Sequence, residues 1–344
     1  MIETLHGTPD QISLVLDHDQ PRSFSKLARA TLPRTILKTL VTECLQFKST
    51  RDKCITLDDD RVFRLVGMPI LGPSGLSGGV FAVAVWSASI LEPLAPIPVV
   101  GAVEWTPSGL LTGNGAAEYL LRLRPPTEYP DGRTVTEMLA SFDRWDDRLA
   151  FLEMFNFQDA PADEWTGLAT KRYEDGSHHQ LHIAARSVGT GDRRRVRAIV
   201  CDVTTTGPPR EADVSVAALR AMPIPPGHAL ALVDLGSALV HEWLTEDHSP
   251  LAGWRHHNPL YDLDGRARVA ATCRDLALGI RDHAAFPVRV RFSPTDNWID
   301  IHTAWTRLPS DTRPQAILDV TPISPNPPPP ISGCGLCYDL THPQ

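Results

Sequence analysis

The chain has 344 residues and a formal net charge of −8; 42% of its residues are hydrophobic and 22% are charged. This length allows two or three domains that each bury a core, and the acidic balance argues against a dedicated nucleic-acid binder, which needs a basic face against the phosphates. There is no basic and apolar leader, the longest apolar run (80–86) is too short to cross a bilayer, and the six cysteines do not suggest a disulfide framework. We therefore expect a cytoplasmic protein with reduced thiols.

The chain has 31 prolines, and some of them cluster in four places, at 92–98, 207–209, 223–226 and 322–330. Proline fixes φ and cannot donate to a strand ladder, so such clusters interrupt secondary structure and favour extended linkers. They predict three domains, at 1–96, 97–206 and 227–322. A linker with a short helix at 207–226 separates the second domain from the third, and a Pro-rich flexible tail follows at 323–344.

The first segment has the pattern of a small α+β unit. Residues 11–16 predict a strand, and a helix follows as far as Cys44, with Pro33 either in its first turn or at a kink. Two further runs, 61–71 and 79–88, predict a β-hairpin around a glycine-rich turn.

That turn contains one motif with chemical meaning. Gly75-Leu76-Ser77-Gly78-Gly79 matches G-x-S-x-G, the nucleophile elbow of α/β-hydrolases. The elbow needs a helix directly after the serine, whereas the residues after Gly79 have the pattern of a strand. The glycines suit a tight hairpin better, and Ser77 as a nucleophile is kept as the alternative.

The central segment opens with an apolar run that ends at Trp105. Asn114 is placed to cap a helix at 115–122, and Thr134 has capping-box spacing for a second helix. Residues 143–157 predict more helix. Three strands follow, at 164–173, around Leu181 and Ile183, and at 197–203.

This order of elements resembles a PAS domain. The resemblance is carried by Trp105, Asn114-x-Ala116-Ala117, Gly132-Arg133, Trp165-x-Gly167, Asp175-Gly176 and Asp202-Val203-Thr204. It implies a curved antiparallel sheet with helices over one face, and a space between them that often holds a small ligand.

The third segment is expected to follow the same plan. It opens with an apolar strand at 229–234, has helical spacing at 267–280, and then alternates as strands. Its ending, 316–321, echoes 198–204, which suggests a duplicated unit.

Over nearly its full length the chain resembles actinobacterial, mycobacterial-type tandem-sensor proteins of the PAS–GAF–PAS kind without an output domain. The opening Ile2-Glu3-Thr4-Leu5, the 75–86 hairpin and 98–105 carry this wider resemblance. It implies an α+β fold of three tandem PAS/GAF-like domains, each a central antiparallel β-sheet flanked by helices.

The candidate ligand-pocket residues are apolar, aromatic or histidine side chains on strand faces that the resemblance turns inward: Trp105, Trp165, His179, Leu181, Ile183, Ile299, Ile301 and Trp305. A plainly filled core is the alternative for all of them. His179 alternates with Leu181 and Ile183, opposite His178 and His182, so it could also line a pocket or ligate haem.

The tail holds Cys334 and Cys337 in a C-x-x-C pattern. A single pair is half of a zinc site and no second pair exists, so these cysteines are weak metal candidates and a functionally quiet tail is the plainer interpretation.

The sequence therefore predicts a non-catalytic sensory or signalling module. It would bind a small ligand or a signalling protein through its PAS/GAF domains and pass the signal to a separate output protein. No flavin-photosensor, P-loop, kinase or cyclase motif is present, and we expect no required cofactor, neither haem nor flavin, and neither nucleic-acid nor membrane partners. A homodimer is left open. The alternatives are a hydrolase that uses Ser77 and an interaction scaffold with vestigial pockets.

Overall fold

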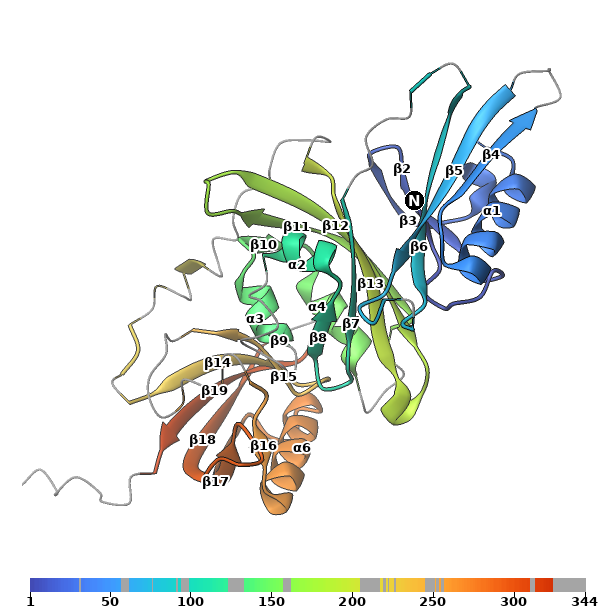
Figure 1. Ribbon diagram of the computed structural model, residues 1–344. Helices are drawn as coiled ribbons and strands as arrows, with labels where there is room; N and C mark the ends of the chain where they lie inside the picture. Colours follow the sequence, from blue (N-terminus) through green and yellow to red (C-terminus); the bar gives the residue numbers. More distant parts are fainter. Residues whose placement is uncertain are drawn as a thin grey trace, which may run out of the picture.

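The computed structural model describes most of the chain, namely residues 1–30, 32–56, 62–75, 77–90, 92–93, 99–122, 133–156, 162–204, 217–218, 221, 223–225, 227–244, 251, 254, 257–309 and 313–323. In these residues the fold is sheet-rich α+β, with three antiparallel sheets and few helices (Figure 1). No helix in the described part has both the length and the apolar character needed to span a membrane.

The N-terminal sheet has the strand order β3-β2-β1-β6-β5-β4. Its strands are β1 (Ile2–Glu3), β2 (Ser13–Asp17), β3 (Gln20–Ser25), β4 (Arg51–Thr56), β5 (Val62–Leu71) and β6 (Val80–Ser89). A 3₁₀ turn η1 (Leu27–Arg29) precedes α1 (Arg34–Phe47), and Pro33 is the residue just before its first turn. Helix α1 buries Leu37, Val41 and Cys44 against one face of this sheet.

The central sheet has the order β10-β11-β12-β13-β7-β8-β9. Its strands are β7 (Val100–Trp105), β8 (Leu110–Gly113), β9 (Arg133–Thr134), β10 (Arg144–Trp145), β11 (Glu164–Arg172), β12 (His178–Val188) and β13 (Arg195–Asp202). Its helical segments are α2 (Gly115–Leu121), α3 (Val135–Ala140), α4 (Arg148–Leu152), η2 (Glu153–Phe155) and η3 (Gly191–Arg193).

The C-terminal sheet has the order β15-β14-β19-β18-β17-β16. Its strands are β14 (Ala229–Asp234), β15 (Leu239–Trp243), β16 (Leu260–Tyr261), β17 (His283–Arg291), β18 (Ile299–Leu308) and β19 (Gln315–Pro322), and its helix is α6 (Leu263–Ala277). Ile280, at the end of the range 267–280 expected to be helical, lies beyond the end of α6 and is exposed.

The three sheets share one arrangement of strands. In each, the first strand lies between the second and the last: β1 between β2 and β6, β7 between β8 and β13, and β14 between β15 and β19. The last three strands of each sheet form a meander. The matching sequence endings at 198–204 and 316–321 thus fall on equivalent strands, β13 and β19.

Helix α2 shows how local sequence positions an element. The Asn114 side chain accepts from the Ala117 amide at 2.9 Å, which caps the helix as expected, and from the Ala102 amide at 3.1 Å. A Cβ on Gly101 would lie 2.5 Å from the Ala117 Cα, so a glycine in β7 and a small residue in α2 allow the close approach of helix and strand.

The central sheet is covered on both faces. One face packs under α2, α3 and α4 in a core that includes Trp105, Leu120, Phe151 and Ile183. The other face packs on the N-terminal sheet, where Ala184, Ile199 and Cys201 meet the residues Phe81, Ala84 and Leu16. Arg186 borders this second contact and donates to Glu3 Oε1 and Ser13 Oγ, both at 3.0 Å.

The C-terminal sheet meets the central helices through β15 (Figure 1). Leu239 packs against the central core, and the Thr136 hydroxyl of α3 donates to the Val240 carbonyl. Arg148 of α4 forms a 2.9 Å ion pair with Glu242, whose side chain is 1% exposed.

The helix expected at 143–157 is shorter than predicted, and little of the 207–226 linker is described. Residues 143–157 begin as a short strand, β10, because Arg144 and Trp145 pair with Thr170 and Ala169, so the helix starts only at Arg148. The helix expected in the 207–226 linker and the tail at 323–344 lie mostly outside the described residues. The domain boundaries stay a prediction.

Candidate functional site

The predicted pocket residues of the central segment lie together. Trp105, Trp165, Leu181 and Ile183 come from β7, β11 and β12 and are at most 6% exposed. All four face the helices and belong to one cluster. The cluster also contains four aromatic residues that were not among the pocket candidates, Phe142, Trp145, Phe151 and Phe155.

The aromatic rings contact one another closely. Trp145 stacks on Trp165 with ring centroids 5.6 Å apart and an interplanar angle of 13°. Phe151 meets Trp105 and Trp165 edge to face, at 5.5 and 5.0 Å. Gly167 makes room for this arrangement, because a Cβ there would lie 2.4 Å from Cζ2 of Trp165.

Three polar atoms in this core have no hydrogen-bond partner among the described residues. They are the indole Nε1 atoms of Trp105, Trp145 and Trp165. A buried N–H group in a protein nearly always has an acceptor, so three unpartnered groups in one core mark this face of the sheet as the candidate binding site.

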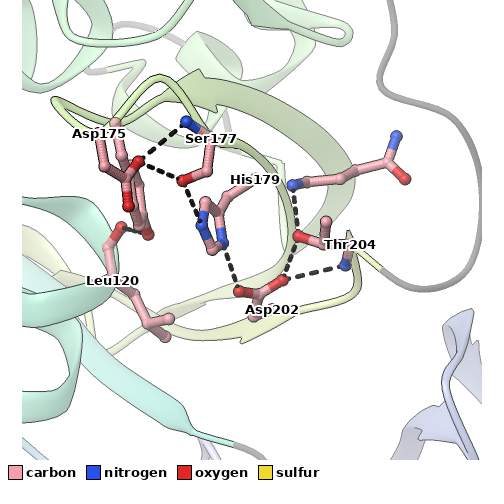
Figure 2. Close-up of polar contacts among 8 residues, drawn as sticks. Leu120, Asp175, Ser177, His179, Asp202 and Thr204 are labelled. Atoms are coloured by element: carbon pink, nitrogen blue, oxygen red, sulfur yellow. Dashed lines mark hydrogen bonds and ion pairs between the residues drawn. The ribbon is translucent and has the colours of Figure 1, made fainter.

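A polar network closes one end of the same face, where β11, β12 and β13 meet the end of α2 (Figure 2). His179 Nδ1 lies 2.7 Å from Asp202 Oδ2, and its Nε2 lies 3.1 Å from the Ser177 hydroxyl. The Ser177 hydroxyl also lies 2.5 Å from Asp175 Oδ1. His179 is therefore at the rim of the core rather than inside it, with a side chain 26% exposed.

The connectivity Ser177–His179–Asp202 is that of a catalytic triad, but the proton positions differ. Ser177 has one hydroxyl proton, and the short contact with the Asp175 carboxylate requires it. The serine then accepts from Nε2 of His179, whereas the serine of a triad donates to its histidine. Ser177, His179, Asp175 and Asp202 thus form a hydrogen-bonded network at the rim of the core.

Hydrogen bonds hold Asp202 as an anion. Burial by itself would raise the pKa of Asp202, but hydrogen bonds from Thr204 and His179 outweigh burial and lower the pKa. Thr204 donates through its amide at 2.9 Å and its hydroxyl at 2.5 Å. The predicted Asp202-Val203-Thr204 ending thus anchors the network that contains His179.

Tyr173 and Lys171 join the network to α2. The Tyr173 hydroxyl donates to the Leu120 carbonyl at 2.7 Å, and Lys171 Nζ donates to the Leu121 carbonyl at 2.5 Å. These carbonyls lie at the end of α2, where helix carbonyls have no partner within the helix. Burial, with the nearby Asp202 charge, raises the pKa of Tyr173 to about 12. Burial, with the nearby Arg122 charge, lowers the pKa of Lys171 to about 8.

The candidates of the C-terminal sheet also belong to a core. Ile301 and Trp305 of β18 are buried, while Ile299 is half-buried at its edge. Trp305 stacks with Phe286 at 6.5 Å, and its Nε1 has no partner among the described residues. These residues pack around α6 and β14, separate from the central cluster.

Ser77 lies in the turn between β5 and β6, and its hydroxyl donates to the Ser74 carbonyl at 2.8 Å. A strand follows the turn, as expected, so the local geometry differs from a nucleophile elbow. Cys334 and Cys337 lie outside the described residues. Among the residues that are described, no group of three His, Cys, Asp or Glu side chains could hold a metal ion.

One solved structure shares the fold of this chain. Neither a family model nor a curated protein matches the chain. Among solved structures, it is similar to the crystal structure of an uncharacterised protein from Mycobacterium tuberculosis, with 19% identity, coverage of 94% of this chain and 95% of that chain, and a TM-score of 0.70. At this identity, the similarity shows a shared fold over nearly the whole length and nothing more.

Two sensory proteins are much more distant. An RNA-binding Light-Oxygen-Voltage receptor has 11% identity over 65% of this chain and 95% of that chain, with a TM-score of 0.24. The periplasmic sensory domain of the Campylobacter jejuni chemoreceptor Tlp1 has 12% identity over 55% and 61%, with a TM-score of 0.17. Scores this low carry no argument about fold or function.

Proposed function

We propose that the chain is a non-catalytic cytoplasmic sensory module of three tandem PAS/GAF-like domains, each an antiparallel sheet flanked by helices. Its central domain binds a small ligand between sheet and helices, and the response passes to a separate output protein. The observation that carries this proposal is the set of three unpartnered indole N–H groups of Trp105, Trp145 and Trp165.

The energetics support a ligand with acceptor atoms. Each buried N–H without an acceptor costs about 1–3 kcal/mol. The surrounding rings offer large apolar surfaces that a planar or aliphatic body could contact. A ligand that combines such a body with oxygen acceptors would meet both features, as small-molecule sites usually do.

Contacts from the central sheet and its helices to the other two sheets could transmit a change caused by ligand binding. The helices that cover the aromatic core contact β15 through Thr136 and Arg148, and the opposite face of the central sheet contacts the N-terminal sheet. A ligand that favours one packing of these helices would shift the population of the arrangement at β15.

The first experiment is native mass spectrometry of the purified full chain, followed by a metabolite screen for shifts in melting temperature. We expect a retained or added small molecule whose effect falls in Trp145→Phe and Trp165→Phe, which keep the ring but remove the N–H. Trp86→Phe is the control, since Trp86 lies on β6 and packs against the cluster between the N-terminal and central sheets instead.

The proposal fails if the protein retains nothing and no metabolite shifts its melting temperature. An interaction scaffold would be the remaining explanation if a protein partner alone has an effect. Esterase or phosphatase activity that disappears in Ser77→Ala would instead contradict the non-catalytic part of the proposal.

A further inference from the structure

A buried ammonium group lies beside the aromatic core. Lys171 of β11 is only 6% exposed, and its Nζ lies 5.3 Å from the centroid of the Phe142 ring. The ammonium has three donors, and the Leu121 carbonyl is the one hydrogen-bond acceptor that the described residues offer it. Burying a cation with most of its donors unused is costly unless another group satisfies them.

A carboxylate lies next to this cation without pairing with it. The Asp143 amide donates to the Thr170 carbonyl at 3.0 Å, which fixes Asp143 beside β11. Its Oδ2 is buried, and no described residue donates to it. The negative charge of Asp143 acts on Lys171 electrostatically, yet no ion pair joins these two described side chains.

Trp145, whose indole N–H has no partner among the described residues, belongs to an edge strand of the same sheet. Strand β10 is the edge of the central sheet, and Trp145 pairs with Ala169, two residues before Lys171. Side chains two residues apart on a strand share a face, so Ala169 and Lys171 share the face of β11 that Trp145 adjoins. Asp143 directly precedes β10, and its amide bonds to the Thr170 carbonyl next to Lys171. The Phe142 ring contacts Trp145 edge to face at 5.0 Å.

We propose that this edge binds a small zwitterion of the α-amino-acid type. Its carboxylate accepts from the Lys171 ammonium and the Trp145 N–H, its amine donates to Asp143, and its side chain contacts the Phe142 and Trp145 rings. An anion alone would leave the Asp143 carboxylate without a hydrogen-bond donor, and a cation alone would leave the Lys171 ammonium without a further acceptor. This inference rests on the proposed function and specifies its ligand class.

Isothermal titration calorimetry of the full chain tests the inference, with glycine, L-alanine, L-leucine and L-phenylalanine as probes. Acetate and methylammonium serve as the two separate halves of the ligand. We expect at least one amino acid to bind and neither half to do so. Losing one charge-assisted hydrogen bond should weaken binding by about 10–100-fold in Asp143→Asn and Lys171→Met.

Asp143→Asn is the decisive variant, because no described residue donates to Oδ2 of this side chain and the substitution keeps its shape. Lys38→Met and Asp300→Asn are controls at exposed positions, and both should bind as the wild type does.

The outcomes separate this inference from the proposed function. Binding of another small molecule, with none of the four amino acids bound, would overturn the zwitterion and leave the sensory module standing. Amino-acid binding that is unchanged in Asp143→Asn would overturn the assigned site. Absence of binding by any small molecule would overturn both.

Discussion

His182 lies on the face of β12 that packs against the N-terminal sheet and is 3% exposed. Its contacts there are with backbone groups of Val15 and Gly167, and no described residue bonds to its Nε2. Burial lowers its pKa to about 4, against 6.5 for an exposed histidine. The ring is therefore neutral in the folded protein at neutral pH.

This histidine should make the protein sensitive to acid. Between pH 6.5 and about 4 the unfolded chain takes up a proton that the folded chain does not, so stability falls as the pH falls through this window. The shift corresponds to roughly 3 kcal/mol at its limit. We expect His182→Gln to flatten the dependence of the free energy of unfolding on pH, measured by urea denaturation between pH 4 and 7.

The control is His178→Gln, since His178 is exposed on the same strand. An equally steep pH dependence in His182→Gln and in the wild type would contradict the prediction. His241, buried beside Arg148 and also with a pKa of about 4, should account for part of the slope that remains.

At the scale of elements, Asn114 links three of them. Its side-chain oxygen caps α2 and accepts from Ala102 in β7, while its nitrogen donates to the Leu71 carbonyl at the end of β5, at 2.9 Å. Asn114→Ala removes the cap and leaves a β7 amide and the Leu71 carbonyl without this partner. We expect a loss of about 2–3 kcal/mol in the free energy of unfolding.

Asn114→Asp provides the matched comparison, because it keeps both accepting contacts and loses only the donor to Leu71. It should lose less stability than Asn114→Ala, as measured by chemical denaturation. Equal losses in the two variants would show that the contact with the N-terminal sheet, rather than the cap, accounts for the stabilisation.

Local signals explain which elements could be predicted. The caps at Asn114 and Thr134 were predicted and are confirmed, since each depends on a residue and an amide three positions later. Strand β10 and its Trp145 were missed, because two residues form a strand only by pairing with β11, which is distant in sequence.

The candidate site was predictable to a similar extent. Alternation placed Leu181 and Ile183 inward, which is confirmed, and His179 at their end. Alternation could not show that the opposite face, with His182, is buried as well, because its cover comes from another sheet. The part played by Lys171 at the end of α2 depends on a contact across 50 residues of chain, which no local pattern reveals.

At the scale of the whole molecule, the arginine of a buried ion pair in the C-terminal part also contacts the central part. Arg313 donates to both carboxylate oxygens of Asp234, at 2.5 and 2.6 Å, and to Asn156 Oδ1 at 2.7 Å. The Arg313 and Asp234 side chains are 7% and 0% exposed. Removing one partner leaves the other charge buried, so Arg313→Met should cost about 3–5 kcal/mol.

The double variant Arg313→Met/Asp234→Leu should recover part of this loss, because no buried charge then remains. Arg289→Met is the control, since its ion pair with Asp300 is exposed and should contribute less than about 1 kcal/mol. Urea denaturation measures all three variants. A loss in Arg313→Met no larger than in Arg289→Met would contradict the prediction.

The two covered faces of the central sheet also have a consequence for synthesis on the ribosome. The N-terminal sheet leaves the ribosome first, but Phe81 and Ala84 gain their cover only when β12 and β13 follow, ending at Asp202. An apolar face of the N-terminal sheet is thus exposed to solvent while more than a hundred further residues are translated. Nascent chains in this state are prone to aggregate. The N-terminal and central sheets should therefore fold together during synthesis, and the nascent chain should depend on chaperones until Asp202 has left the ribosome.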